Sequence, residues 1–158
     1  MRNNVLKHIG VGLLFVFSQL LIFQYLTIFG AIVDPLLIFI LWTTLKYQRF
    51  EVLLFAAGLG LFQDALFDIW GLNMFTKTVT VFLIYKVVAR NPEVKLLFWQ
   101  VFVIVLASAT IHNVIYFAFS SFLDVYSSLF SPIILILGSS LYTAIVGSVL
   151  YILKGDTN

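Results

Sequence analysis

Six apolar runs, each separated from the next by a short polar break, constrain the fold of this chain more than any other feature. They cover residues 9–29, 35–47, 51–68, 72–88, 96–119 and 132–153. Most approach the length of about 20 residues that lets a helix cross the hydrocarbon core of a bilayer. They lack the alternation of apolar and polar residues that a barrel strand requires. The pattern predicts one all-α domain, residues 1–158, built as a compact bundle of six transmembrane helices.

Composition favours the same class of protein. Hydrophobic residues make up 62% of the 158 residues, and charged residues make up only 10%. A soluble domain carries about 25% charged residues and has too little interior to hide this much apolar surface. Because the chain has no cysteine, disulfides, thiolate nucleophiles and thiolate-bound metals are excluded. The net charge of +2 gives no indication of nucleic-acid binding.

Each of the first two runs differs from an ordinary membrane span in one respect: the first opens like a signal peptide, and the second is short. The first follows Arg2 and Lys7, as in a signal peptide, but it is too long and no small-x-small cleavage site follows it. We therefore expect an uncleaved membrane helix. The second begins at Asp34-Pro35, a cap residue followed by a residue suited to the first helical turn. At about 20 Å it is shorter than the bilayer core, so it must be a short span, be shielded by neighbours or thin the bilayer locally.

The charged residues predict the orientation of the bundle. With a cytoplasmic N-terminus, eight of the nine Lys and Arg residues fall on the cytoplasmic side, namely Arg2, Lys7, Lys46, Arg49, Lys86, Arg90, Lys95 and Lys154. The opposite side receives the acids Asp34, Asp64, Asp68 and Asp124. Because Lys and Arg collect on the cytoplasmic side of membrane proteins, both termini are predicted to be cytoplasmic.

The third run carries the candidate site. Ala56, Gly60, Asp64 and Asp68 follow one another four residues apart, so they are expected to share one helical face. Small residues let helices approach closely in lipid. Acids inside a membrane are costly unless they reach water, a cavity or a partner. Gly71 then ends the run.

Lys77 is the one basic residue on the acidic side, about one turn inside the fourth run. A buried ammonium needs a partner, and Asp64 or Asp68 could supply it across the turn between the third and fourth helices. Two alternatives stay open, because Lys77 could extend to headgroups or water, or could bind a ligand or a proton. Gln19 and Gln24 of the first run either bond to neighbouring helices or help to line an internal pocket.

A polar stripe follows the fifth run, where Ser108, His112 and Tyr116 lie four residues apart with Asn113 beside them. We expect the stripe to face the bundle and to form interhelical hydrogen bonds. A single histidine is poor evidence for a metal site, which needs about three to four ligands. The chain also lacks the Gly-x-Ser-x-Gly elbow that a serine hydrolase would add to Ser108 and His112. We therefore predict no catalytic residue, no cofactor and no metal.

Small residues form a face of the sixth run. Ser140, Ala144 and Ser148 lie four residues apart, a spacing that is typical of close helix packing in membranes. The sequence leaves open whether this face packs inside the bundle or against a partner subunit.

A glycine-rich motif lies in the third run, reading Gly58-Leu59-Gly60-Leu61-Phe62-Gln63-Asp64 and followed by Gly71-Leu72. With the early Gln19, the six closely spaced spans and the length of the chain, it resembles the rod shape-determining protein MreD family over nearly the whole chain. That family shows a Gly-rich helix running into Gly-Leu-x-x-Asp and a later Gly-Leu. Its Ser- or Asn-rich stretch is replaced here by residues 65–70. The resemblance therefore gives Asp68 no role.

The resemblance implies a non-catalytic scaffold in the bacterial inner membrane that supports cell shape and lateral peptidoglycan synthesis. Its implied partner is the single-span protein MreC and, through MreC, the MreB filaments, RodA and a class B penicillin-binding transpeptidase. It also implies a bundle similar to the substrate-binding subunits of energy-coupling-factor vitamin transporters. The alternative is such a small-molecule-binding subunit, with an outer-side pocket near Asp64, Lys77 and Gln19. A proton-coupled transporter is a third possibility.

Overall fold

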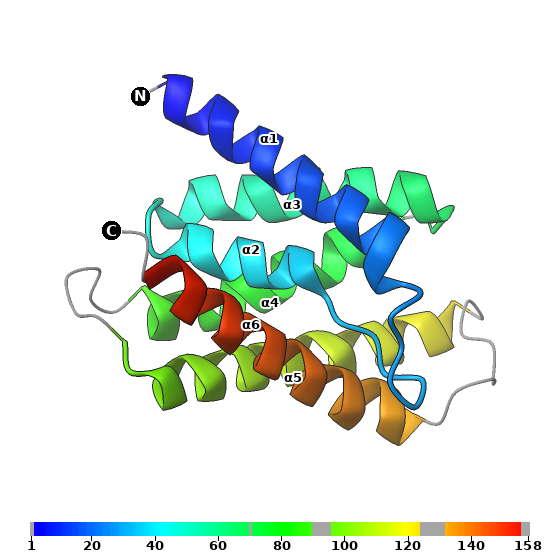
Figure 1. Ribbon diagram of the computed structural model, residues 1–158. Coiled ribbons are helices and arrows are strands. Elements are labelled where there is room, and N and C mark those ends of the chain that lie inside the picture. The colour runs from blue at the N-terminus through cyan, green and yellow to red at the C-terminus, as the bar shows by residue number, and fades with distance from the viewer. Residues whose placement is uncertain (1, 70, 90–95, 124–131, 156–158) are drawn as a thin grey trace.

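The computed structural model describes residues 2–69, 71–89, 96–123 and 132–155, and these form a bundle of helices (Figure 1). The elements are α1 (Arg2–Ser18), η1 (Gln19–Phe23), α2 (Pro35–Thr44), α3 (Arg49–Phe67), α4 (Leu72–Val88), α5 (Phe98–Phe122), η2 (Ile134–Gly138) and α6 (Ser139–Gly155). The π-helical turn η1 directly follows α1, and η2 directly precedes α6. The described residues therefore contain six helices, as the apolar runs predict. Four of them are long and apolar enough to cross a membrane, which fits a helical membrane protein.

The short helix α2 is the centre of the bundle. Nine of its ten residues are buried, and only Trp42 is partly exposed. In Figure 1 it lies between α1 and α3 on one side and α5 and α6 on the other. A helix that is apolar all round is one that protein surrounds on every face. Neighbouring helices therefore shield the short run, which is one of the three outcomes that its length allows.

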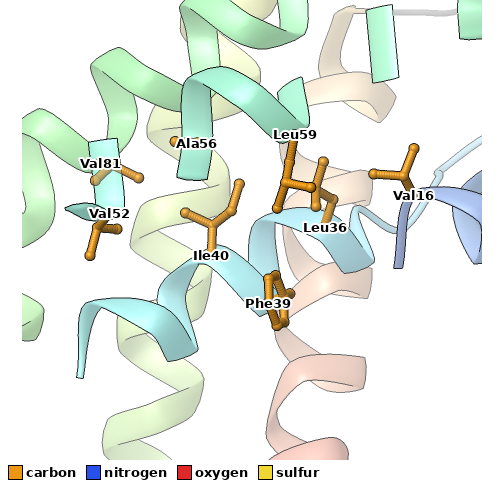
Figure 2. Packing of buried hydrophobic residues seen from close by; sticks show 8 residues of the cluster. All are labelled: Val16, Leu36, Phe39, Ile40, Val52, Ala56, Leu59 and Val81. Carbon is orange, nitrogen blue, oxygen red and sulfur yellow. The ribbon is translucent and has the colours of Figure 1, made fainter. Parts of the chain in front are cut away.

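Two apolar clusters share α2. The first joins it to α1, α3 and α4, and its buried members are Val16, Leu36, Phe39, Ile40, Val52, Ala56, Leu59 and Val81 (Figure 2). The second joins it to α4, α5 and α6, with Val33, Ile38, Leu41, Ile84, Val88, Val101, Val105 and Ala144. Because opposite faces of α2 enter different clusters, this helix holds the two halves of the bundle together.

Successive helices run in opposite directions, so the start of α1 and the end of α6 lie at the same end of the bundle, on the left in Figure 1. The turn between α2 and α3 and the end of α4 lie there too, whereas the loop 24–34 and the turn between α3 and α4 lie at the opposite end. Lys46 and Lys86 belong to the first end and Asp68 to the second. Arg90, Lys95 and Asp124 lie outside the described residues.

The predicted bounds of the first helix are wrong, since the helix runs from Arg2 to Phe23 instead of over 9–29. Beyond it the chain turns, because Phe29 and Gly30 have positive φ angles of 52° and 87°. An L-residue rarely adopts this conformation and a helix cannot contain it. Hydropathy alone places no break there, because the residues on both sides of the turn are apolar.

Side chains of α6 hold the loop that follows the first helix. The Ile32 N–H donates to Ser139 Oγ at 3.0 Å, and the Asp34 N–H donates to Thr143 Oγ1 at 3.1 Å. These bonds satisfy backbone groups that a helix would have paired internally. The other differences are small: α2 ends at Thr44 instead of 47, α3 covers Arg49–Phe67 instead of 51–68, α5 covers Phe98–Phe122 instead of 96–119, and α6 ends at Gly155 instead of 153. The bounds of α4 are as predicted.

Candidate functional site

The glycine-rich motif forms the contact between α3 and α4. A Cβ atom at Gly60 would lie 2.7 Å from the Cα of Met74 and 3.1 Å from the carbonyl oxygen of Asn73. No residue larger than glycine fits at that distance unless the backbone shifts. Gly60 therefore lets the first turn of α4 lie directly on α3, which is the role that small residues have between membrane helices.

Asp64 binds the N-terminus of α4 from its place on α3. Its Oδ1 accepts a hydrogen bond from the Asn73 N–H at 2.9 Å, and its Oδ2 accepts one from the Met74 N–H at 2.8 Å. The first N–H groups of a helix have no partner within the helix, and the positive end of the helix dipole favours an anion. The side chain is buried. The carboxylate thus caps α4, and no lysine is needed beside it.

Asp68 does not continue the stripe that Ala56, Gly60 and Asp64 form. It is exposed and ends α3 in the left-handed conformation, with φ of 55°. Gly71 follows with φ of 73° and precedes the first residue of α4. The expectation of two carboxylates on one helical face is therefore wrong, because the helix has already ended at the second of them.

Lys77 pairs with Asp34, and the predicted pairing with Asp64 or Asp68 is wrong. The fully buried Lys77 Nζ lies 2.5 Å from Asp34 Oδ2, and it also donates to Asn73 Oδ1 at 3.2 Å. Asp34 caps α2 as its position before Pro35 predicts, since its Oδ1 accepts from the Leu37 N–H at 2.9 Å. Lys77 lies one turn beyond the residues that Asp64 caps, and it reaches α2 instead.

His112 of α5 extends this polar cluster. Its Nε2 lies 3.2 Å from Thr76 Oγ1 and 3.9 Å from Asp34 Oδ2, and its Nδ1 lies 3.2 Å from Asn113 Oδ1. The Asn113 side chain in turn donates to Ser140 Oγ at 3.0 Å. Polar side chains of α2, α4, α5 and α6 are thereby linked in one network inside the apolar bundle, where an unpaired polar group would be costly.

The other two members of the polar stripe on α5 are Ser108, which forms a hydrogen bond within its own helix, and Tyr116, which lines the cavity described below. Ser108 is buried and donates to the carbonyl oxygen of Ile104 at 2.7 Å. Tyr116 is half-buried. The small face of α6 lies inside the bundle, because its three predicted members are all fully buried: Ser140, Ala144 and Ser148.

A cavity of about 240 Å³ adjoins the network. Its lining comes from η1, the loop 24–34, the second half of α3, the start of α4, α5, η2 and the start of α6: Gln19, Gln24, Ile32, Val33, Asp34, Gln63, Phe67, Ile69, Asn73, His112, Asn113, Tyr116, Leu135 and Ser139. Gln19 and Gln24 thus line a pocket that is partly open to the surface, and Gln19 also donates a hydrogen bond to the carbonyl oxygen of Val33. Lys77 does not line this cavity, but it binds Asp34 and Asn73, which do. Asp64 lines a separate cleft of about 220 Å³ together with Asp68.

A third hollow, of about 500 Å³, lies between α1 and α3, and its lining is mostly apolar, with Tyr47 and Glu51 as its polar members. Ile9 and Leu13 line it from α1, and Leu54, Gly58 and Phe62 line it from α3. Gly58 is exposed, and a Cβ atom added there would have no neighbour within 4 Å. The two glycines of the motif therefore differ, because Gly60 packs inside the chain and Gly58 faces outward.

Sequence reasoning missed several residues of the site, among them Gln63 and Asn73. Both are buried and both line the cavity. Asn73 lies four residues before Lys77, a spacing that places both side chains on one helical face and could have revealed the contact. Gln63 is a polar residue inside a predicted membrane span, and that by itself marks a group in need of a partner.

Comparison of the chain with protein-family models, curated proteins and solved structures finds no match. Among the residues that the structure describes, no group of three or more His, Asp or Glu side chains is placed to hold a metal ion. The described groups of the site form hydrogen bonds and one ion pair between helices, and they leave beside them a cavity that polar and apolar side chains line together.

Proposed function

We propose that the chain is a scaffold of the bacterial cell-elongation machinery, similar to MreD, that binds a single-span membrane protein of the MreC type. It performs no reaction in this role. It resides in the inner membrane with both termini in the cytoplasm. Through its partner it contributes to the assembly of MreB filaments, RodA and a class B penicillin-binding transpeptidase.

Gly58 is the observation that carries this proposal. It is exposed on the apolar groove between α1 and α3, and it has no packing role within the chain. A glycine is a poor choice for an exposed helix position, since it costs about 1 kcal/mol relative to alanine. In a membrane, however, a small residue on an apolar groove lets the backbone of another helix approach closely. The groove therefore fits the transmembrane helix of a partner.

The rest of the motif supports the same role. Gly60 and Asp64 are engaged in the contact between α3 and α4, so they hold α3 in a fixed position beneath the groove. A rigid surface loses little entropy when a partner binds to it. The motif through which the chain resembles the family thus combines a fold contact with an outward-facing small residue, as a scaffold requires.

The distribution of charge supports the proposed orientation. Lys46 and Lys86 belong to the end of the bundle at which the first and last helices begin and end, and Asp68 belongs to the other end. Because Lys and Arg mark the cytoplasmic side, the end with the termini faces the cytoplasm. An even number of spans is compatible with this orientation.

Copurification with an MreC-type protein tests the proposal. The variant Gly58→Leu would fill the groove, and we expect it to reduce the recovered partner by about tenfold, which corresponds to about 1.4 kcal/mol. Gly10→Leu is a matched control, because Gly10 on α1 is also exposed and also has open space around it, yet it does not line the groove. Equal recovery with both variants, or no recovery with the unmodified chain, would contradict the proposal.

A phenotype supplies an independent test. Depletion of the chain should round the cells, and expression of Gly58→Leu should restore rod shape less well than Gly10→Leu. Rod-shaped growth after complete depletion would exclude a role in elongation.

A further inference from the structure

Two glutamine side chains leave a buried hydrogen-bond acceptor unused at the polar cavity. Gln19 is 8% exposed and Gln63 is 3% exposed, and both line the cavity of about 240 Å³. Among the described residues, neither Oε1 atom has a hydrogen-bond partner. Buried polar atoms in folded proteins nearly always have one, so each such atom needs an explanation.

The amide group of Gln19 is held in place. Its Nε2 donates to the carbonyl oxygen of Val33 at 3.2 Å, which fixes the side chain against the loop 24–34. Because one end of the amide is bound to the protein, the acceptor at the other end is presented at a fixed position. A pre-placed acceptor is what a binding site uses to orient its ligand.

The charges around the cavity are already balanced. Asp34 is paired with Lys77, and His112 is bonded to Thr76 and Asn113. Among the described residues of the lining, the two Oε1 atoms are thus the fully buried polar atoms that lack a partner, and no charge is left unpaired. This chemistry favours a neutral molecule with N–H or O–H donors over an ion, because an ion would be buried without a counter-charge.

The size and walls of the cavity limit the ligand further. An apolar cavity of about 150 Å³ holds one benzene ring, so the present volume accommodates a somewhat larger molecule. Phe67, Ile69 and Leu135 contribute apolar surface beside the polar groups. Gln19 begins the π-helical turn η1, and Leu135 belongs to the π-helical turn η2. Such turns occur frequently at functional sites, because they shift side chains out of helical register.

From these observations we infer that the cavity binds a neutral small molecule of roughly one or two rings, held by donors that face the Oε1 atoms of Gln19 and Gln63. Its flat apolar part lies against the apolar side chains of the lining. The inference goes beyond the proposed scaffold function and does not depend on it, since the cavity and the apolar groove are lined by different residues.

A matched pair of probes tests the inference on the full-length protein in detergent micelles. Benzimidazol-2-one is a neutral bicyclic molecule with two N–H donors, and 1,3-dimethylbenzimidazol-2-one has the same rings without donors. We expect the first to bind at least about tenfold more tightly than the second, as measured by calorimetry or saturation-transfer NMR, because only the first satisfies the two acceptors. Equal affinities, or no binding of either probe, would overturn the inference.

Glutamine variants locate the binding site. Gln63→Met removes one acceptor at similar volume, and we expect the preference for the N–H probe to fall by about tenfold. Gln100→Met is the control, since Gln100 lies outside the cavity lining and its Oε1 already accepts from the Leu97 N–H at 3.0 Å. This control should keep the preference. Loss of the preference in Gln100→Met, or its retention in Gln63→Met, would count against the site.

The stability of the empty protein gives a readout that does not depend on any probe. Gln63→Met should raise the thermal midpoint, because an unsatisfied buried acceptor is replaced by an apolar group. Gln100→Met should lower the midpoint, because a formed hydrogen bond is lost. A lower midpoint for Gln63→Met would show that its Oε1 is satisfied within the protein, and the inference would then fail.

Discussion

Asp34 and Asp64 are two carboxylates in the same apolar bundle, and each caps a helix in a different way. Asp64 binds the N-terminus of a neighbouring helix, with both oxygens on backbone N–H groups of α4. Asp34 caps its own helix with one oxygen and pairs with the Lys77 ammonium through the other. Asp64 thus accepts hydrogen bonds from two backbone N–H groups, whereas Asp34 accepts from one backbone N–H group and from the Lys77 ammonium.

The difference shows which kind of partner a sequence can reveal. Lys77 is close to Asp64 in sequence but pairs with Asp34, 43 positions away. The carboxylate of Asp64 has no need of it, because the positive end of a helix supplies comparable stabilisation. A lysine in a membrane span therefore indicates that a carboxylate is near, without indicating which one.

The largest expected effect is that of breaking the pair of Asp34 with Lys77. Lys77→Met keeps the length of the side chain but leaves the Asp34 carboxylate without its cation. Removing one partner of a buried pair costs about 3–5 kcal/mol, so we expect a large drop in the thermal midpoint in detergent. Unchanged stability would mean that the pair contributes nothing to the fold.

A double-mutant cycle identifies the partner. Asp34→Asn combined with Lys77→Met should be more stable than the sum of the two single changes predicts, by at least about 1 kcal/mol. The cycle of Asp64→Asn with Lys77→Met should show a smaller coupling, because these two side chains form no hydrogen bond with each other and share only Asn73 as a partner. A larger coupling in the second cycle would restore the pairing that the sequence predicted.

Much of the fold could be predicted because it follows from the spacing of apolar residues. The six runs, the Asp34-Pro35 start of α2 and the bounds of α4 all depend on local signals, namely hydropathy, caps and proline. The end of the first helix could not be predicted, because the turn at Phe29 and Gly30 is held by side chains of α6. Such a contact depends on the tertiary structure and leaves no periodic pattern.

The candidate site was predictable only in part. Because they are polar residues within apolar runs, Gln19, Lys77 and His112 were predicted to be groups that need a partner, and all three are buried. Their partners could not be predicted, because the contact of Asp34 with Lys77 depends on the position of α2 at the centre of the bundle. The four-residue spacing predicted Gly60, but not Gly58, on the packing face of the third helix, and Gly60 does pack against Met74 while Gly58 faces outward.

The two glycines of the motif allow a direct comparison at the Asp64 site. Gly60→Ala places a Cβ atom 2.7 Å from the Cα of Met74, so α4 must move away from the helix that caps it. Overpacking of this kind costs about 1–3 kcal/mol. Gly58→Ala has open space and should be neutral or should stabilise α3 by up to about 1 kcal/mol. Thermal unfolding of both variants in one detergent measures the contrast, and a reversed order would contradict the close contact.

A smaller effect is expected when the charge of Asp64 is removed. Asp64→Asn keeps one acceptor oxygen but replaces the other with an N–H₂ group that faces the Met74 N–H. Loss of one capping bond and of the favourable charge should cost about 1–2 kcal/mol, less than the loss of Lys77. Unfolding in detergent measures the loss, and amide exchange at Asn73 and Met74 should become faster. Unchanged exchange would show that the carboxylate does not cap α4.

The smallest effect concerns Asp68, which ends α3 in a left-handed conformation without a partner for its side chain among the described residues. Glycine adopts this conformation without a steric penalty, so Asp68→Gly should stabilise the chain, by less than about 1 kcal/mol. Asp68→Val is the matched opposite, because a β-branched residue is strained at positive φ and should destabilise the same turn. Equal midpoints for the two variants would mean that the backbone at residue 68 is not left-handed, and that Asp68 could after all lie on the face of Asp64.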